Sequence, residues 1–156
     1  MIVNHENPKE DIGLRINVSV MVRAAGSEDA WEVVSETHNR ITTVGITALT
    51  KMLAGNQWRA THIHVGTGNS TPIVSQTGLD TDVFTAALDR RTHPAADELA
   101  LSALITNTEA NGNTLTEAGL YVDTTMISRA LIFPGIVKTG AVEATIQFKY
   151  KLAELI

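Results

Sequence analysis

VEATIQFKYKL, residues 142–152, alternates apolar and polar side chains along its whole length. A period of two is typical of a strand with one buried and one solvated face. LRINVSVMV, residues 14–22, repeats the pattern near the other end of the chain. The inward residues we expect from the two stretches are Leu14, Ile16, Val18, Val20, Val22, Val142, Ala144, Ile146, Phe148, Tyr150 and Leu152. Two such strands predict a mainly β fold.

The turn residues AAGSED, 24–29, follow the first strand, and WEVVSE, 31–36, alternates again. These two runs are expected to pair as a hairpin. Weaker strand patterns lie at residues 60–65, 82–90, 99–106, 114–122 and 128–133, and the Gly-, Ser- and Thr-rich stretch 66–79 predicts a long loop.

One segment, about 42–54, changes to a helical period. Ile46, Leu49 and Leu53 are three and four residues apart, beside a stripe of Gly45, Ala48 and Met52. Thr42 or Thr43 can cap its start, and Gly55 can end it in the left-handed conformation. We expect the aliphatic stripe of this short α-helix to cover a face of the sheet.

About eight strands and one helix predict a β-sandwich or a flattened barrel. The length of 156 residues suits one domain. We expect residues 14–156 to form this single β-rich domain and residues 1–13, a polar stretch with a proline, to form an extended arm.

The composition excludes several classes of function. Twelve Lys and Arg against seventeen Asp and Glu give a net charge of -5, which argues against a nucleic-acid partner. No apolar run is long enough for a membrane span, and the N-terminus does not have the pattern of a signal peptide. The chain has no cysteine, so thiolate metal sites and cysteine nucleophiles are excluded. The protein is expected to remain in the cytosol until it assembles.

His62 and His64 form the pattern closest to a metal site, because alternate residues of a strand project to the same face. A zinc site needs three or four ligands, and no further histidine is close in the sequence. We therefore expect outward-facing surface histidines with Ile63 and Val65 inward, and no metal.

Gly66 and Gly68 lie in VGTG, residues 65–68, a segment similar to a phosphate-binding loop. The Gly-Lys-Ser/Thr ending of such a loop is missing, so no nucleotide or other cofactor is expected. The two glycines are expected to supply unusual backbone dihedrals where the strand leaves the sheet.

Paired carboxylates do not indicate catalysis here. Those of Asp80 and Asp82, Asp97 and Glu98, and Glu28 and Asp29 fall in turns or at strand edges, and nothing brings two of them together across a cleft. No nucleophile motif is present. We assign no catalytic residue and expect neither an enzyme nor a small-molecule substrate.

Glu117 lies between apolar strand residues, where an unpaired carboxylate is costly. If residues 114–122 and 128–133 form a hairpin, Arg129 comes within about two residues of facing Glu117, and the two pair across the strands. Pro134 cannot donate to a ladder, so it predicts a sheet edge or a bulge.

Four segments also carry a resemblance. NRITTVGITALTKMLAG (39–55), THIHVGTGNSTP (61–72), TEAGLYVD (116–123) and SRALIFPGIVKT (128–139) occur in an order that resembles a family of small virion proteins of tailed bacteriophages. The resemblance covers about two thirds of the chain. The matching positions are Asn39, Ile41, Thr42, Gly45, Leu49, Leu53, Gly66, Gly68, Pro72, Leu79, Glu117, Gly119, Leu120, Arg129, Phe133, Pro134, Lys138 and Thr139.

The resemblance implies a non-enzymatic structural protein of the tail, baseplate or fibre-attachment region, located in the virion. Its partners would be other virion proteins and further copies of itself as a homo-oligomer. The stretch ahead of Asn39 and the fibre extension of longer relatives are not shared. Two alternatives stay open, a capsid decoration or head-associated protein and a receptor- or carbohydrate-binding β-sandwich, for which Trp58 is the one candidate stacking platform.

Overall fold

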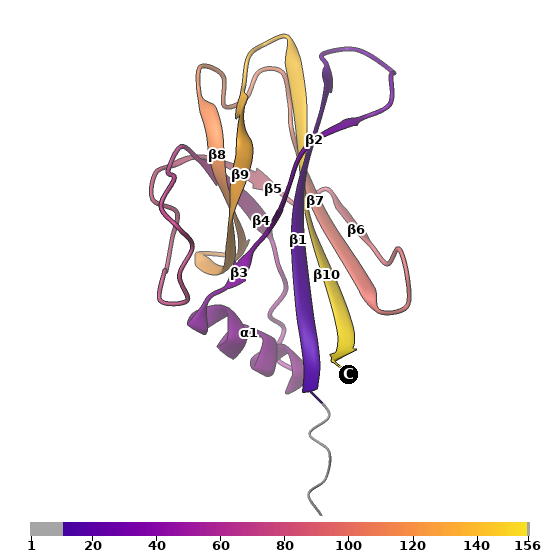
Figure 1. Ribbon diagram of the computed structural model, residues 1–156, viewed down its shortest axis with the longest axis vertical. Coiled ribbons are helices and arrows are strands. Elements are labelled where there is room, and N and C mark those ends of the chain that lie inside the picture. Colours follow the sequence, from indigo (N-terminus) through magenta and orange to yellow (C-terminus); the bar gives the residue numbers. More distant parts are fainter. Residues whose placement is uncertain (1–10, 156) are drawn as a thin grey trace, which may run out of the picture.

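The computed structural model describes residues 11–155, which form two antiparallel five-stranded sheets and one short helix (Figure 1). Buried residues of both sheets make up one hydrophobic core. The described strands do not close into a barrel, so the β-sandwich is the correct alternative of the two predicted. No helix in this part of the chain is long and apolar enough to cross a membrane.

The first sheet has the strand order β2-β1-β10-β7-β6, and the second has the order β3-β9-β8-β4-β5. The bounds in the first sheet are β2 (Glu32–His38), β1 (Asp11–Ala24), β10 (Val142–Leu155), β7 (Glu98–Ile105) and β6 (Arg90–Thr92). Those in the second are β3 (Arg40–Ile41), β9 (Thr125–Val137), β8 (Thr114–Val122), β4 (His62–Gly66) and β5 (Asp82–Ala87).

Strands β1 and β10 lie side by side at the centre of the first sheet, and Val18 pairs with Phe148. The predicted alternation is confirmed, because Val18, Val20, Ile146 and Phe148 are at most 1% exposed. At the end of β10 the pattern fails, and Leu152 is 57% exposed. Strand β1 begins at Asp11, so residues 11–13, predicted to belong to an extended arm, are part of the first sheet. The rest of the predicted arm, residues 1–10, lies outside the described residues.

The chain crosses between the sheets within one stretch that the sequence predicts as a single strand, and again directly after β2. The predicted strand 82–90 is divided into β5 in the second sheet and β6 in the first. The backbone N–H of Leu88 donates to the carbonyl of Thr61, and the next N–H, of Asp89, donates to Ser102 in the other sheet. The short strand β3 makes the other crossing after β2, so the described residues contain ten strands rather than about eight.

The helix α1 (Thr43–Leu53) has the predicted caps. The Thr42 Oγ1 accepts from the N–H of Gly45 at 2.9 Å, and Gly55, at φ 88°, ends the helix. The buried face is the small-residue stripe, however, since Gly45 and Ala48 are buried while Ile46 and Leu53 are 54% and 90% exposed. The reason is close contact with β9, because a Cβ on Gly45 would lie 2.0 Å from the carbonyl oxygen of Ile127.

Strands β8 and β9 form the predicted hairpin, and β9 extends beyond the predicted 128–133. Leu115 pairs with Ile136 and Glu117 with Leu131, so Thr116 alone lies opposite residues 132–135. Pro134 is therefore part of a bulge, in agreement with its missing backbone donor. The bulge leaves Phe133 79% exposed.

Candidate functional site

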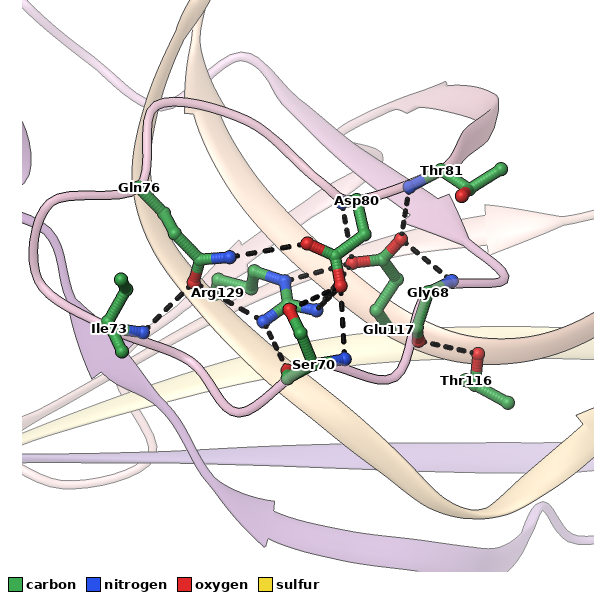
Figure 2. A network of polar contacts seen from close by, with 9 residues as sticks. All are labelled: Gly68, Ser70, Ile73, Gln76, Asp80, Thr81, Thr116, Glu117 and Arg129. Carbon is green, nitrogen blue, oxygen red and sulfur yellow. Dashed lines mark hydrogen bonds and ion pairs between the residues drawn. The ribbon is translucent and has the colours of Figure 1, made fainter.

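Glu117 is 0% exposed, and its carboxylate organises the loop between β4 and β5. Its Oε1 accepts from the backbone N–H groups of Gly68 at 2.9 Å and Thr81 at 2.8 Å, and its Oε2 accepts from that of Asp80 at 3.1 Å. These donors come from both ends of the loop, residues 67–81. One buried carboxylate thereby joins the two ends of this loop to β8 (Figure 2).

The second member of the network is Arg129, which is 1% exposed on β9. Its Nη2 lies 2.8 Å from Glu117 Oε2 and 3.0 Å from Asp80 Oδ2, and its Nη1 donates to the carbonyl of Ser70 at 2.8 Å and to Gln76 Oε1 at 3.3 Å. The predicted cross-strand pair is present. The guanidinium extends beyond the hairpin into the loop, as Figure 2 shows.

Asp80 connects the ion pair to the middle of the loop. Its Oδ2 accepts from the N–H of Ser70 at 3.0 Å and from the Ser70 hydroxyl, and its Oδ1 accepts from Gln76 Nε2 at 3.4 Å. The Ser70 hydroxyl, with help from the Ser70 N–H and the positive charge of Arg129, holds the pKa of Asp80 below its usual value, against partial desolvation. An ionised Asp80 is therefore part of the folded loop.

The glycines of VGTG serve a different purpose from the one predicted. Neither Gly66 nor Gly68 has a positive φ; the described glycines that do are Gly26, Gly55 and Gly112. A Cβ on Gly66 would lie 2.3 Å from the carbonyl oxygen of Thr81, and one on Gly68 would lie 2.6 Å from Glu117 Oε1. Close approach of the backbone to the buried carboxylate, rather than unusual dihedrals, requires glycine at both positions.

Gly119, beside the network on β8, is also a site of close approach. A Cβ there would lie 2.9 Å from the ring of Tyr121 and 3.1 Å from Leu79. The loop therefore packs directly against the backbone of β8. The residues to which the sequence or the resemblance gives a structural role therefore lie in the β8–β9 hairpin or where β4 meets the 67–81 loop: Gly66, Gly68, Glu117, Gly119, Arg129 and Pro134.

His62 and His64 face away from the core as predicted, with Ile63 and Val65 buried between and beside them. Their Nδ1 atoms have different partners, Thr61 Oγ1 at 2.8 Å for His62 and Asp82 Oδ2 at 2.5 Å for His64. The ring of His64 stacks on Tyr121 with centroids 3.7 Å apart. In the part of the chain that the structure describes, no three metal-ligating side chains come together.

An apolar groove lies between α1 and the first sheet. One part, of about 450 Å³, lies toward Leu53 and Leu152, and an adjoining part, of about 280 Å³, extends to Trp58 and Leu101. Both parts share the lining residues Leu49, Met52, His93, Leu99 and Tyr150. The small-residue face of α1 places the helix against β9 and leaves the aliphatic residues Leu49 and Leu53 to line this opening.

Trp58 does not form the exposed platform that the sequence suggests. It is half-buried at the inner end of the groove, and the Lys51 ammonium lies 4.6 Å from the centre of its ring.

Sequence reasoning found Glu117 and Arg129 and missed Ser70, Gln76 and Asp80, because their roles depend on the path of an irregular loop. It also missed Lys138, which is 0% exposed. Alternation gives a signal in that case, since Ile136 and Lys138 are buried on either side of the exposed Val137. The buried lysine follows directly from extending the strand pattern past Pro134.

The fold and these features define a β-sandwich with a buried ion-pair network on one hairpin and an open apolar groove at one end. Comparison of the chain with protein-family models, with curated protein sequences and with solved structures found no match.

Proposed function

We propose that this protein is a non-enzymatic structural subunit of a tailed-phage virion, in the tail, baseplate or fibre-attachment region, and that it works by self-association and by contact with other virion proteins. The resemblance of its four ordered segments supports the virion assignment. The observation that supports assembly is the apolar groove, with Leu53 90% exposed and Leu152 57% exposed at its mouth.

An exposed apolar groove favours an occupant, because removing apolar surface from water is worth roughly 25 cal/mol per Å². Contiguous exposed apolar surface on a folded protein commonly marks an interaction site. The occupant we propose is a second copy of the chain. The exposed side chains of Leu53 on α1 and Leu152 on β10 project at the mouth of the groove and can enter the groove of the other copy. Such a self-complementary surface suits a symmetric oligomer.

The ion-pair network supports a structural role for the resembling segments. Glu117 and Arg129 use their hydrogen-bonding capacity to hold residues 67–81, and Gly66 and Gly68 allow the close approach that this requires. Their chemistry is explained by the folded loop itself and calls for no substrate. A loop held in this way beside the β8–β9 hairpin is a suitable surface for a neighbouring virion protein.

Light scattering or native mass spectrometry of the purified full chain tests self-association. Leu53→Lys adds one charge to α1 at the mouth of the groove and is expected to shift an oligomer toward monomer. Thr47→Lys, at another exposed position of the same helix, is the matched control and is expected to leave the oligomer unchanged. A wild-type monomer at all accessible concentrations would contradict assembly through this groove.

Location in the virion is tested separately, by peptide mass spectrometry of purified particles of the phage whose genome encodes the chain and by labelling the particles with a specific antibody. We expect label at the tail or baseplate. Label over the capsid would favour the decoration alternative. Absence of the protein from purified particles would reject the virion assignment, whatever its oligomeric state.

A further inference from the structure

The side chain of Lys138 is buried at the end of β9 with neutral partners. Its Nζ donates to Asn111 Oδ1 at 2.9 Å and to the carbonyl of Thr139 at 3.1 Å. Among the described residues no carboxylate lies within ion-pair distance of this nitrogen. Burial lowers the pKa of Lys138, opposed by the negative charges of Glu109 and Glu143. The surroundings therefore raise the fraction of Lys138 that carries the uncharged, nucleophilic amine at a given pH.

The partner amide of Asn111 is held from both sides. Its Oδ1 accepts from Lys138, and its Nδ2 donates to the carbonyl of Asn107 at 2.8 Å. The backbone strengthens this arrangement, because the N–H of Lys138 donates to Asn113 at 2.9 Å and the N–H of Gly112 donates to Lys138 at 3.0 Å. Holding two reacting groups in contact removes much of the entropic part of a reaction barrier.

The usual competing reaction of an Asn-Gly sequence is disfavoured here. In that reaction the backbone nitrogen of the following glycine attacks the Asn side-chain carbon and forms a succinimide. The nitrogen of Gly112 is instead hydrogen-bonded to the carbonyl oxygen of Lys138. The amine of Lys138 is thus the nucleophile that the geometry presents to Asn111.

We propose that Lys138 and Asn111 form an intramolecular isopeptide bond in the folded protein. The neutral Nζ attacks the side-chain carbon of Asn111, a bond forms between them, and the bond from that carbon to Nδ2 breaks. One proton passes from Nζ to the departing Nδ2, which leaves as ammonia. No oxidant, cofactor or activated group is required, and the product is a secondary amide.

The bond would join the loop between β7 and β8 to the segment that leads from β9 into β10. A covalent link across residues 111–138 restricts the unfolded chain and so raises the free energy of unfolding. Residues 111 and 138 flank the β8–β9 hairpin. A force applied to the two ends of the chain would therefore pass through the bond and would not pull the hairpin out of the second sheet. The isopeptide bond does not depend on a location in the virion.

Intact-mass measurement of the denatured full chain is the test. The expected mass is lower than the sequence mass by one ammonia molecule. Trypsin is then expected to release a branched peptide that joins residues 92–129 to residues 130–149, because the modified Lys138 is no longer cleaved. An intact mass equal to that of the sequence, in protein incubated after folding, would overturn the proposal.

A succinimide at Asn111 would give the same intact mass, but hydroxylamine cleaves it between residues 111 and 112. Cleavage without the branched peptide would therefore also overturn the proposal. Lys138→Met and Asn111→Ala cannot form the bond, so each variant is expected to have the mass calculated from its own sequence, without loss of ammonia. Asn56→Ala is the control, because Asn56 is an exposed asparagine that follows α1, away from the segments that hold Lys138 and Asn111, and this variant is expected to keep the mass loss.

Discussion

Glu117 Oε2 and Arg129 Nη2 lie 2.8 Å apart, on adjacent strands, with both side chains at most 1% exposed. Removing two charges from water costs several kcal/mol each unless hydrogen bonds compensate. Backbone N–H groups and a carbonyl of the 67–81 loop supply that compensation. The pair therefore depends on the loop as much as the loop depends on the pair.

Glu117→Ala is expected to reduce the free energy of unfolding by about 3–5 kcal/mol, because it leaves Arg129 as a buried charge without its partner. Urea unfolding followed by circular dichroism measures the change. The control is Asp97→Ala, which removes an ion pair with Lys151 whose side chains are both 47% exposed, and is expected to cost about 0–1 kcal/mol. An unchanged free energy of unfolding in Glu117→Ala would reject a stabilising role for the pair.

Gly45→Ala is expected to destabilise the protein by about 1–3 kcal/mol through overpacking, even though alanine is favoured in helices by about 1 kcal/mol. The added Cβ would lie 2.0 Å from the backbone oxygen of Ile127, which has little freedom to move. Thermal unfolding is the measurement. Gly140→Ala, whose Cβ would lie 3.6 Å from its nearest neighbour, serves as the control. A stabilised Gly45→Ala variant would mean that α1 does not pack this closely on β9.

Gly68→Ala is expected to loosen the loop at residues 67–81, because its Cβ would lie 2.3 Å from Asp80 Cβ and 2.6 Å from Glu117 Oε1. Faster limited proteolysis within the loop and a loss of about 1–3 kcal/mol in stability are the expected results. Gly78→Ala, in the same loop, would meet only the Tyr121 hydroxyl oxygen at 3.8 Å and is the matched control. Equal cleavage rates in the two variants would contradict this account of Gly68.

Stability is expected to fall in acid partly through Asp80. Its pKa in the folded protein is below the ordinary value of 3.8, so the ionised form stabilises the folded state above that pH. This contribution is lost as the pH falls from 3.8 through the lowered pKa. Asp80→Asn lacks this contribution at neutral pH, so its free energy of unfolding is expected to be lower than that of wild type. The difference between the two is expected to become smaller below pH 3.8. Urea unfolding across this range checks the prediction, which a constant deficit would contradict.

The sequence predicts the strands that alternate on a solvated sandwich face, such as β1 and β10, because burial of one face imposes a period of two. It fails at 82–90, where one weak strand pattern is divided between two sheets, because the local sequence does not specify which strand each half pairs with. It also misassigns the buried face of α1, because apolar size favours Ile46 and Leu53 whereas the space over β9 admits only Gly45 and Ala48. The Glu117–Arg129 pair could be predicted because the position of the turn in a hairpin fixes which residues of the two strands lie opposite each other.

The sequence by itself determined the β class, the helix with its caps, the hairpin and the need to pair a carboxylate among apolar strand residues, all consequences of local periodicity and of the cost of burying charge. The tertiary structure alone decided the sheet order, the course of the 67–81 loop around Arg129, the groove beside α1 and the contact of Lys138 with Asn111. These features depend on segments distant in the chain, and their partners are chosen by packing space and hydrogen-bond geometry rather than by any local pattern.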